Sequence, residues 1–439
     1  MSTKKGKNGS KVGNGSTCSS HLKHEGPGLW RVFPIIMVLL GVVWGILWAP
    51  SDPLNDAETL KGTSEPPKPR TTSTLHDVVM TGDDCGADQF LSTTHVVRGF
   101  HVACLNLEHG SDNVSVTVFQ NGQRNVNQTL VLGKEDASTH TLRTELKTRL
   151  GLDTPGKDPP NKFAWAMYTP DGRKKIEAIE DAMESRLVFI FKGGVFIWPG
   201  VEVGHVQTVR GLPELGEIEI QTLSMVPLVF EAHNFLLDEE CDHIKARADP
   251  HLKPSPVTLM DHDQGKDDSN WRTSTTYFMP SRGDPKLKAI DSRVALFTRI
   301  PEGHQEQVQV LRYNKGQRYT AHHDFFNPKM YKKDQRTLES IDGGRRNRIV
   351  TVFWYLSDVE EGGETIFPRA GGRTGRVDFS DCTIGLKVKP RVGKVAMFYS
   401  MRPDGQFDDY SLHGACPVIS GQKWAANKWV WSAPVGYNR

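Results

Sequence analysis

Cysteine is scarce in this sequence, with six residues among 439. This low density excludes a small scaffold held together by disulfides. Neither sign of charge is in excess, because 54 basic and 52 acidic residues leave a net charge of +2. Without a dense basic patch, we expect no nucleic-acid partner. The length leaves room for two or three domains.

Long apolar runs are also scarce, and the one present is residues 32–49. This uncharged stretch of about 18 residues is near the minimum for a membrane-spanning helix. A cleaved signal peptide is the alternative, but about 30 residues precede the run and Trp48-Ala49-Pro50 is a poor cleavage site. Basic residues precede the run and acidic residues follow it, so the positive-inside rule places the N-terminus in the cytosol. We therefore expect a single-pass type II signal anchor in the endoplasmic reticulum or Golgi membrane.

The segments on either side of this run are polar. Residues 1–31 are rich in Gly, Ser, Lys and Asn without a hydrophobic period, which is typical of a disordered tail, here on the cytosolic side. Residues 50–84 are polar and contain prolines, so we expect a stalk on the luminal side.

Residues 85–205 are predicted to form a separate small domain. Residues 114–119 alternate in hydrophobicity before Asn121-Gly122, which indicates a β-hairpin. Leu142, Leu146 and Leu150 follow a helical period, and residues 163–168 and 187–191 are predicted strands. This order of elements is that of a ubiquitin-like β-grasp, so we expect an α+β domain of that type.

Two pairs of residues in this region are candidates for modifications that the predicted luminal location permits. Asn113 and Asn127 begin glycosylation sequons on the predicted luminal side. Cys85 and Cys104 are candidates for a disulfide, because the lumen is oxidising.

Polar residues at two places in the C-terminal half suggest a metal site. His322 and Asp324 are separated by one residue, so on a β-strand both point to the same face. His413 supplies a second imidazole, and two histidines with one carboxylate form the facial triad that binds non-haem Fe(II). An iron site that activates dioxygen needs a co-substrate such as 2-oxoglutarate. Lys423 is the candidate cation for its distal carboxylate, because a charge-assisted hydrogen bond contributes roughly 1.5–3 kcal/mol.

The motifs around these residues resemble the catalytic domain of prolyl 4-hydroxylases, which are Fe(II)- and 2-oxoglutarate-dependent dioxygenases. Three segments of residues 227–439 carry the resemblance: Tyr313–Asp324, Gly362–Pro368, and His413–Val418 followed by Lys423-Trp424. The resemblance implies a mainly β domain with flanking helices, built as a double-stranded β-helix (jelly roll). The apolar run 349–356 fits a buried strand of such a domain, and residues 388–399 are predicted to form a hairpin about residues 391–393.

The resemblance also implies roles for individual residues. His322, Asp324 and His413 would bind iron, while Lys423, Tyr313 and Thr365 would bind 2-oxoglutarate. Arg348 and Trp429 match positions near the peptide channel. Trp431 stands where relatives often have a histidine that helps to bind substrate, which puts the peptide preference in doubt. Cys382 and Cys416 would form a luminal disulfide, the alternative being two unpaired thiols.

The leading hypothesis is therefore hydroxylation of peptidyl proline to 4-hydroxyproline in proline-rich or collagen-like proteins of the secretory pathway. Dioxygen would be consumed, succinate and carbon dioxide released, and ascorbate would rescue oxidised iron. One alternative is another 2-oxoglutarate oxygenase, acting on lysyl residues or a free amino acid; Lys423, where some relatives use arginine, argues against it. The other alternative is a non-catalytic luminal interaction protein, against which the complete iron and co-substrate set argues.

Overall fold

The computed structural model describes residues 85–107, 113–133, 138–154, 164–182, 185–375, 377–378 and 380–435. The predicted cytosolic tail (1–31), signal anchor (32–49) and stalk (50–84) lie outside the described residues. Within those described ranges, no helix is both long and apolar enough to cross a membrane.

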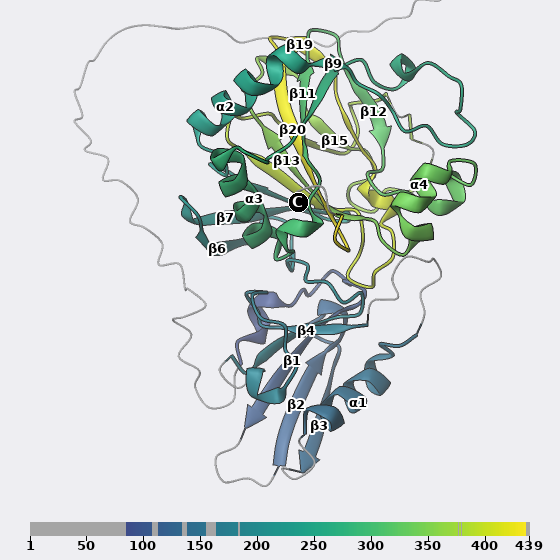
Figure 1. Cartoon of the computed structure of the whole chain (residues 1–439). Coiled ribbons are helices and arrows are strands. Elements are labelled where there is room, and N and C mark those ends of the chain that lie inside the picture. Colours follow the sequence, from purple (N-terminus) through teal and green to yellow (C-terminus); the bar gives the residue numbers. More distant parts are fainter. Residues whose placement is uncertain are drawn as a thin grey trace, which may run out of the picture. The chain divides into compact units, whose positions relative to one another are not determined.

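A five-stranded sheet is the core of the small domain, residues 85–205 (Figure 1). Its strands lie in the order β3-β2-β1-β5-β4. The α-helix begins after Ser138, whose hydroxyl accepts a hydrogen bond from the Thr141 N–H (3.2 Å), and it packs Leu142 and Leu146 against the sheet. The bounds are β1 (Phe100–Leu107), β2 (Asn113–Phe119), β3 (Asn127–Gly133), α1 (Thr139–Leu150), β4 (Ala166–Tyr168) and β5 (Leu187–Phe191).

The predicted hairpin, helix and last strand of this domain are present, but the β-grasp topology is wrong. The strand β1, which the sequence patterns did not reveal, pairs antiparallel with both β2 and β5. A ubiquitin-like β-grasp would instead place a hairpin strand in parallel beside the last strand. The disulfide between Cys85 and Cys104 is formed, as predicted.

The larger unit is a barrel of facing antiparallel sheets. Its main sheets have the orders β6-β7-β8-β17-β13-β20-β11-β10-β9 and β12-β18-β15-β16, and β14 pairs with β19. Since β6 and β7 extend the nine-stranded sheet, this unit begins at Val206, and the predicted boundary at residue 227 is too late. The early elements are β6 (Val206–Leu212), β7 (Gly216–Met225), β8 (Leu228–Ala232), α2 (Asp238–Ala248), β9 (Lys253–Pro254), β10 (Thr275–Met279), α3 (Pro285–Thr298), β11 (Val308–Tyr313) and β12 (Tyr319–His322). The later elements are α4 (Gln335–Ser340), β13 (Arg348–Tyr355), β14 (Glu361–Gly362), β15 (Thr365–Phe367), β16 (Leu386–Val388), β17 (Val395–Tyr399), β18 (His413–Ala415), β19 (Val418–Ser420) and β20 (Lys423–Trp431).

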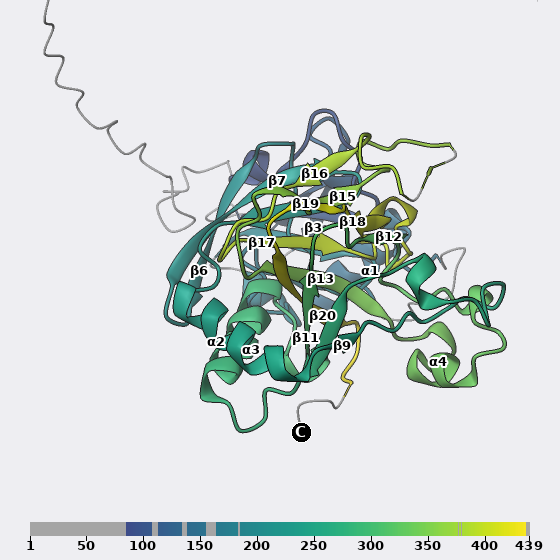
Figure 2. The same ribbon diagram turned by 90° about the horizontal axis from the view of Figure 1, so that it is seen from above.

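The nine-stranded sheet has a different neighbour on each face. In Figure 2 the strands β15, β16 and β18 lie over one face, and α2 and α3 cover the other. Alternate side chains of β13 therefore enter two cores: Val352 and Trp354 pack with the helices, while Phe353 and Tyr355 face the four-stranded sheet. This is the predicted double-stranded β-helix, and the space between its sheets holds the site described below.

The predicted hairpin over residues 388–399 is wrong. The strand β16 ends at Val388 in the four-stranded sheet, whereas β17 begins at Val395 in the nine-stranded sheet. The Gly393 turn lies in a connection that crosses between the sheets, rather than in the tip of a hairpin.

Candidate active site

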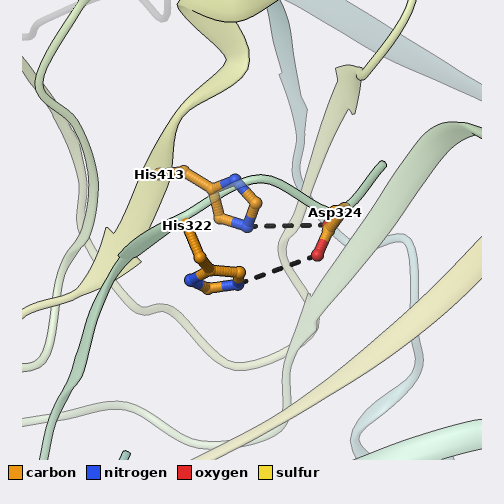
Figure 3. Close-up of side chains that lie close together, drawn as sticks. All are labelled: His322, Asp324 and His413. Carbon is orange, nitrogen blue, oxygen red and sulfur yellow. Dashed lines mark ion pairs between the residues drawn. The ribbon is translucent and has the colours of Figure 1, made fainter. Parts of the chain in front are cut away.

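His322, Asp324 and His413 converge between the two sheets, as Figure 3 shows. His322 ends β12 and His413 begins β18, where they are direct cross-strand partners. Asp324 follows β12 instead of lying on it, yet its carboxylate faces both imidazoles. Its oxygens lie 3.7 Å from Nε2 of His322 and 3.6 Å from Nε2 of His413.

Hydrogen bonds fix the orientation of all three side chains. Nδ1–H of His322 donates to the carbonyl oxygen of Thr320 (2.9 Å), and Nδ1–H of His413 donates to that of Ser411 (3.0 Å). Both rings are thereby held with Nε2 toward Asp324. The Thr351 hydroxyl donates to the Asp324 carboxylate (2.6 Å).

The electrostatics of the site keep His322 and Asp324 in the forms that bind metals. Desolvation, together with the neighbouring His413, lowers the pKa of His322 to about 3, so this imidazole is neutral at physiological pH. Desolvation alone would raise the pKa of Asp324. His413, His322, Arg348 and the Thr351 hydroxyl outweigh it and lower that pKa to about 2.

This donor set fits a divalent first-row metal such as Fe(II). One ligand atom from each of the three residues lies within 4.8 Å of the other two. An ion with bonds of about 2.1 Å can bridge the 3.6 and 3.7 Å separations. Two imidazoles and one carboxylate are also the ligands of the Fe(II) facial triad, which leaves positions open for other ligands.

Lys423 begins β20 and is completely buried. Its ammonium donates to the carbonyl oxygen of Gly363 (2.7 Å) and lies over the rings of Tyr313, Phe353 and Tyr355 at 5.3–5.6 Å. Desolvation lowers the pKa of Lys423 to about 7, although Glu364 opposes the shift. No carboxylate in the described part of the chain lies within ion-pair distance of this ammonium, so an anionic ligand is the partner it lacks.

Two polar groups accompany this lysine. Tyr313 is the direct cross-strand partner of Lys423, and Thr365 lies on β15. The Thr365 hydroxyl accepts a hydrogen bond from the Tyr355 hydroxyl (2.8 Å), which leaves its own proton to donate to a ligand.

Arg348, Trp429 and Trp431 lie together near the iron-ligand candidates. Arg348 and Trp431 are cross-strand partners, and the guanidinium lies 3.5 Å above the Trp429 ring. Glu306 joins them by accepting two hydrogen bonds from Arg348 (2.6 and 3.0 Å) and one from the Trp431 indole (2.6 Å). Arg348 also donates to the Asp324 carbonyl (3.4 Å), which connects this group to the triad.

Comparison with known proteins places this site in a family. Residues 308–431 match the model of the 2OG-Fe(II) oxygenase superfamily. The chain is 43% identical over 227 residues to probable prolyl 4-hydroxylase 3 of Arabidopsis thaliana, and the match covers 50% of this chain and 75% of that protein. This chain belongs to the prolyl 4-hydroxylase family.

Other similarities involve proteins with related names. Probable prolyl 4-hydroxylase 10 of Arabidopsis thaliana is 42% identical over 217 residues, covering 48% of this chain and 71% of that protein. A solved structure of the viral collagen prolyl hydroxylase from Paramecium Bursaria Chlorella virus-1 is 24% identical and covers 47% of this chain and 96% of that chain, with a TM-score of 0.33.

The chain contains the second predicted disulfide, between Cys382 and Cys416. Cys416 is buried just beyond β18, the strand that begins with His413. The bond therefore removes a thiol from the neighbourhood of the candidate metal ligands, where it would be open to oxidation.

Several contacts of the candidate site were not predicted from the sequence. Thr351 and Tyr355 lie on the face of β13 that points between the sheets, and the polar atoms of both bond to predicted site residues. Their spacing of four residues along a predicted strand was a usable signal, because it puts two hydroxyls on one face. Glu306 offered no such signal, since only the fold brings it to Arg348.

Proposed function

We propose that this chain is an Fe(II)- and 2-oxoglutarate-dependent dioxygenase that hydroxylates prolyl residues of polypeptides at C4. The convergence of His322, Asp324 and His413 at one point between the sheets is the observation that carries the proposal. Its membership of the prolyl 4-hydroxylase family and the match to the 2OG-Fe(II) oxygenase model support the same activity. Bound iron would supply coordination of 2-oxoglutarate and dioxygen, and the oxidising power for the proline C–H bond.

Lys423 binds the distal carboxylate of 2-oxoglutarate, the one that does not coordinate the iron. A buried ammonium without a carboxylate partner among the described residues gains most from such an anion. Thr365 donates its hydroxyl proton to the same carboxylate, and Tyr355 orients that hydroxyl. Tyr313, Phe353 and Tyr355 surround the ammonium and keep water away from it.

Arg348, Trp429 and Trp431 border the path of the peptide in this proposal. Glu306 holds the Arg348 guanidinium by two hydrogen bonds, so its planar group is presented in one orientation. The Trp431 indole N–H donates a hydrogen bond to the same Glu306 carboxylate. We therefore assign peptide preference to this group and oxygen activation to the triad.

The proposed setting is the lumen of the endoplasmic reticulum or Golgi, with residues 32–49 as a type II anchor. Two disulfides support an oxidising compartment. Asn113 and Asn127 are exposed at the first residues of β2 and β3, so both sequons are accessible for glycosylation. Proline-rich or collagen-like proteins of the secretory pathway are the proposed substrates, and ascorbate is the proposed reductant for oxidised iron.

The test is peptide hydroxylation by the full-length protein purified in detergent. The protein is incubated with Fe(II), 2-oxoglutarate, ascorbate and either proline-rich or collagen-like peptides, and tandem mass spectrometry locates the added oxygen. We expect 4-hydroxyproline and one succinate for each hydroxyl group. Oxygen added to lysine or to a free amino acid would indicate another oxygenase, and absence of both metal binding and succinate would indicate a non-catalytic protein.

A further inference from the structure

The loop of residues 400–412, which joins β17 to β18, leads directly into the iron-ligand candidate His413. The Ser411 carbonyl near its end accepts the Nδ1–H bond that orients His413 (3.0 Å). The conformation of this loop therefore sets the position of one metal ligand.

The same loop also contacts both neighbours of Asp324. The Asp409 carbonyl accepts a hydrogen bond from Nε2–H of His323 (3.1 Å). The Phe407 ring stacks on Phe325, with centroids 4.4 Å apart and an interplanar angle of 8°. One loop thus contacts the chain on both sides of Asp324 and precedes His413.

The small domain holds the other end of this loop by backbone contacts. The Gly193 N–H donates to the Pro403 carbonyl (2.7 Å). A Cβ atom at Gly193 would lie 2.6 Å from the Gly405 nitrogen, and one at Gly99 would lie 2.5 Å from the Asp404 Cα. Two glycines of the small domain are thus required for the backbones to approach this closely.

A third contact anchors the small domain where the loop begins. The Trp198 N–H donates to the hydroxyl of Tyr399, the last residue of β17 (3.2 Å), and the Trp198 indole donates to the Phe297 carbonyl (2.8 Å). Phe191, Phe196 and Trp198 also belong to the hydrophobic core that contains Tyr399 and Phe407. The contact is therefore a packed interface rather than a single touching point.

We propose that the small domain is a positioning module for the metal site. Gly99 and Gly193 fix the position of residues 403–405. The rest of the loop thereby fixes the positions of His413 and of the two residues beside Asp324. The inference rests on the proposed function, because it takes the three residues as metal ligands. It goes beyond that function by giving residues 85–205 a part in the reaction, other than as a spacer.

The direct test is Gly193→Ala in the full-length protein, with Gly303→Ala as the matched control. Neither glycine has a positive φ, and a Cβ at Gly303 would meet no atom within 4 Å. Mn²⁺ affinity, measured from the electron paramagnetic resonance signal of the free ion, is the readout that needs no turnover. We expect Gly193→Ala to weaken Mn²⁺ binding by roughly tenfold or more, as loss of an outer-shell support does, and to raise the succinate formed per hydroxyproline. Gly303→Ala should match the wild type in both.

A second variant covers the case in which Gly193→Ala does not fold. Asp404→Ala removes the carboxylate that pairs with Arg402 (3.2 Å) and accepts the Gln406 N–H (3.1 Å), so it loosens the loop without adding an atom. It should weaken Mn²⁺ binding in the same direction, with a smaller effect.

The outcomes separate this inference from the function on which it rests. A folded Gly193→Ala protein, or an Asp404→Ala protein, that keeps the wild-type Mn²⁺ affinity and the wild-type ratio of succinate to hydroxyproline would overturn the positioning role. Hydroxylation by the wild-type protein would in that case leave the proposed function intact. A fall in melting temperature with unchanged Mn²⁺ affinity would show a merely structural contact, and would also overturn it. A wild-type protein that binds no Mn²⁺ and forms no hydroxyproline would instead remove the proposed function.

Discussion

The small domain and the barrel are both antiparallel sheets, but they bury different kinds of side chain. In the described part of residues 85–205, Ser92 and His101 are the only buried polar or charged residues. The barrel buries many, among them Asp324 and Lys423. Burying such groups is unfavourable unless partners or ligands compensate, so the barrel gives up stability at the candidate site. The interior of the small domain is mainly apolar. In the proposal above, this domain contributes to the metal site through the residues at its surface that contact the 400–412 loop.

The largest expected effect comes from removing a charged group of the barrel interior. Asp324→Ala should abolish proline hydroxylation, since it deletes the carboxylate between His322 and His413. We expect Mn²⁺ affinity to fall by more than the roughly 10–100-fold typical of losing an outer-shell partner. Metal titration and succinate production are the measurements.

The matched control for this variant is an aspartate of the small domain. The Asp153 side chain is 59% exposed and pairs only with Lys147 in the described structure. Asp153→Ala should retain wild-type metal affinity. Metal binding that survived in Asp324→Ala would show that the carboxylate is no ligand, and the contrast between the two regions would fail.

The next effect concerns the buried lysine. Lys423→Ala should raise KM for 2-oxoglutarate by roughly ten- to a hundredfold, the value of a charge-assisted hydrogen bond. Mn²⁺ affinity should remain that of the wild type, because the lysine is not a metal ligand. Steady-state kinetics and metal titration together distinguish the two roles, and an unchanged KM would contradict the assignment.

The same lysine predicts a pH dependence in the wild type. Burial lowers the pKa of Lys423 to about 7, so the ammonium loses its proton as the pH rises through that value. Binding of the anionic co-substrate requires the charged form. We therefore expect KM for 2-oxoglutarate to rise above about pH 7, by at most about tenfold per pH unit. A KM that is constant from about pH 6 to 9 would count against Lys423 as the anion-binding group.

A fourth prediction tests the comparison in the small domain. The double variant Cys85→Ala/Cys104→Ala removes a bond that closes a loop with a sequence separation of 19 residues. We expect a loss of about 3 kcal/mol in stability, because the unfolded chain regains the entropy of that loop. Calorimetry measures the loss. Metal affinity below the melting temperature should not change, and a parallel loss of affinity would show that the disulfide also supports the barrel.

The smallest effect concerns a carboxyl group of the barrel loop. Burial raises the pKa of Asp408 to about 6, although the Tyr410 N–H donates to it. The folded state therefore retains a proton that the unfolded chain releases near pH 4. This contribution to stability is complete below about pH 4 and is lost as the pH rises through about 6.

Asp408→Asn removes that pH dependence and keeps an oxygen to accept the Tyr410 N–H. The variant should be more stable than the wild type by about 1–2 kcal/mol at pH 7. It should differ little from the wild type at pH 4. Chemical unfolding at the two pH values checks this, and an equal difference at both would show that titration of Asp408 is not the cause.

Local patterns predicted much of this structure, but pairing partners were beyond them. The alternating run at residues 114–119 and the leucine period at 142–150 identified a strand and a helix, since both signals lie within a few residues. The strand Phe100–Leu107 has little alternation and is buried on both faces over much of its length, so it was not recognised. Without it, the order of the small sheet was wrong.

The site was predictable for a different reason. The candidate metal ligands and Lys423 lie in motifs that resemble a known family, and the structure brings His322, Asp324 and His413 together. The connection 389–394 shows what local sequence cannot predict. A turn motif indicates that the chain reverses direction, but not whether the next strand joins the same sheet. Glu306 and the loop contacts of Gly193 depend on long-range packing, which local sequence does not encode.

The two imidazoles take their orientation from backbone carbonyl groups, each located two residues upstream in the chain. A side-chain substitution cannot delete a carbonyl group, so the tautomer of both rings is shielded from most point mutations. Evolution and directed mutagenesis can therefore vary the side chains that line the pocket while the orientation of the two histidine rings is retained. In this respect the scaffold is a tolerant starting point for enzymes with altered substrates.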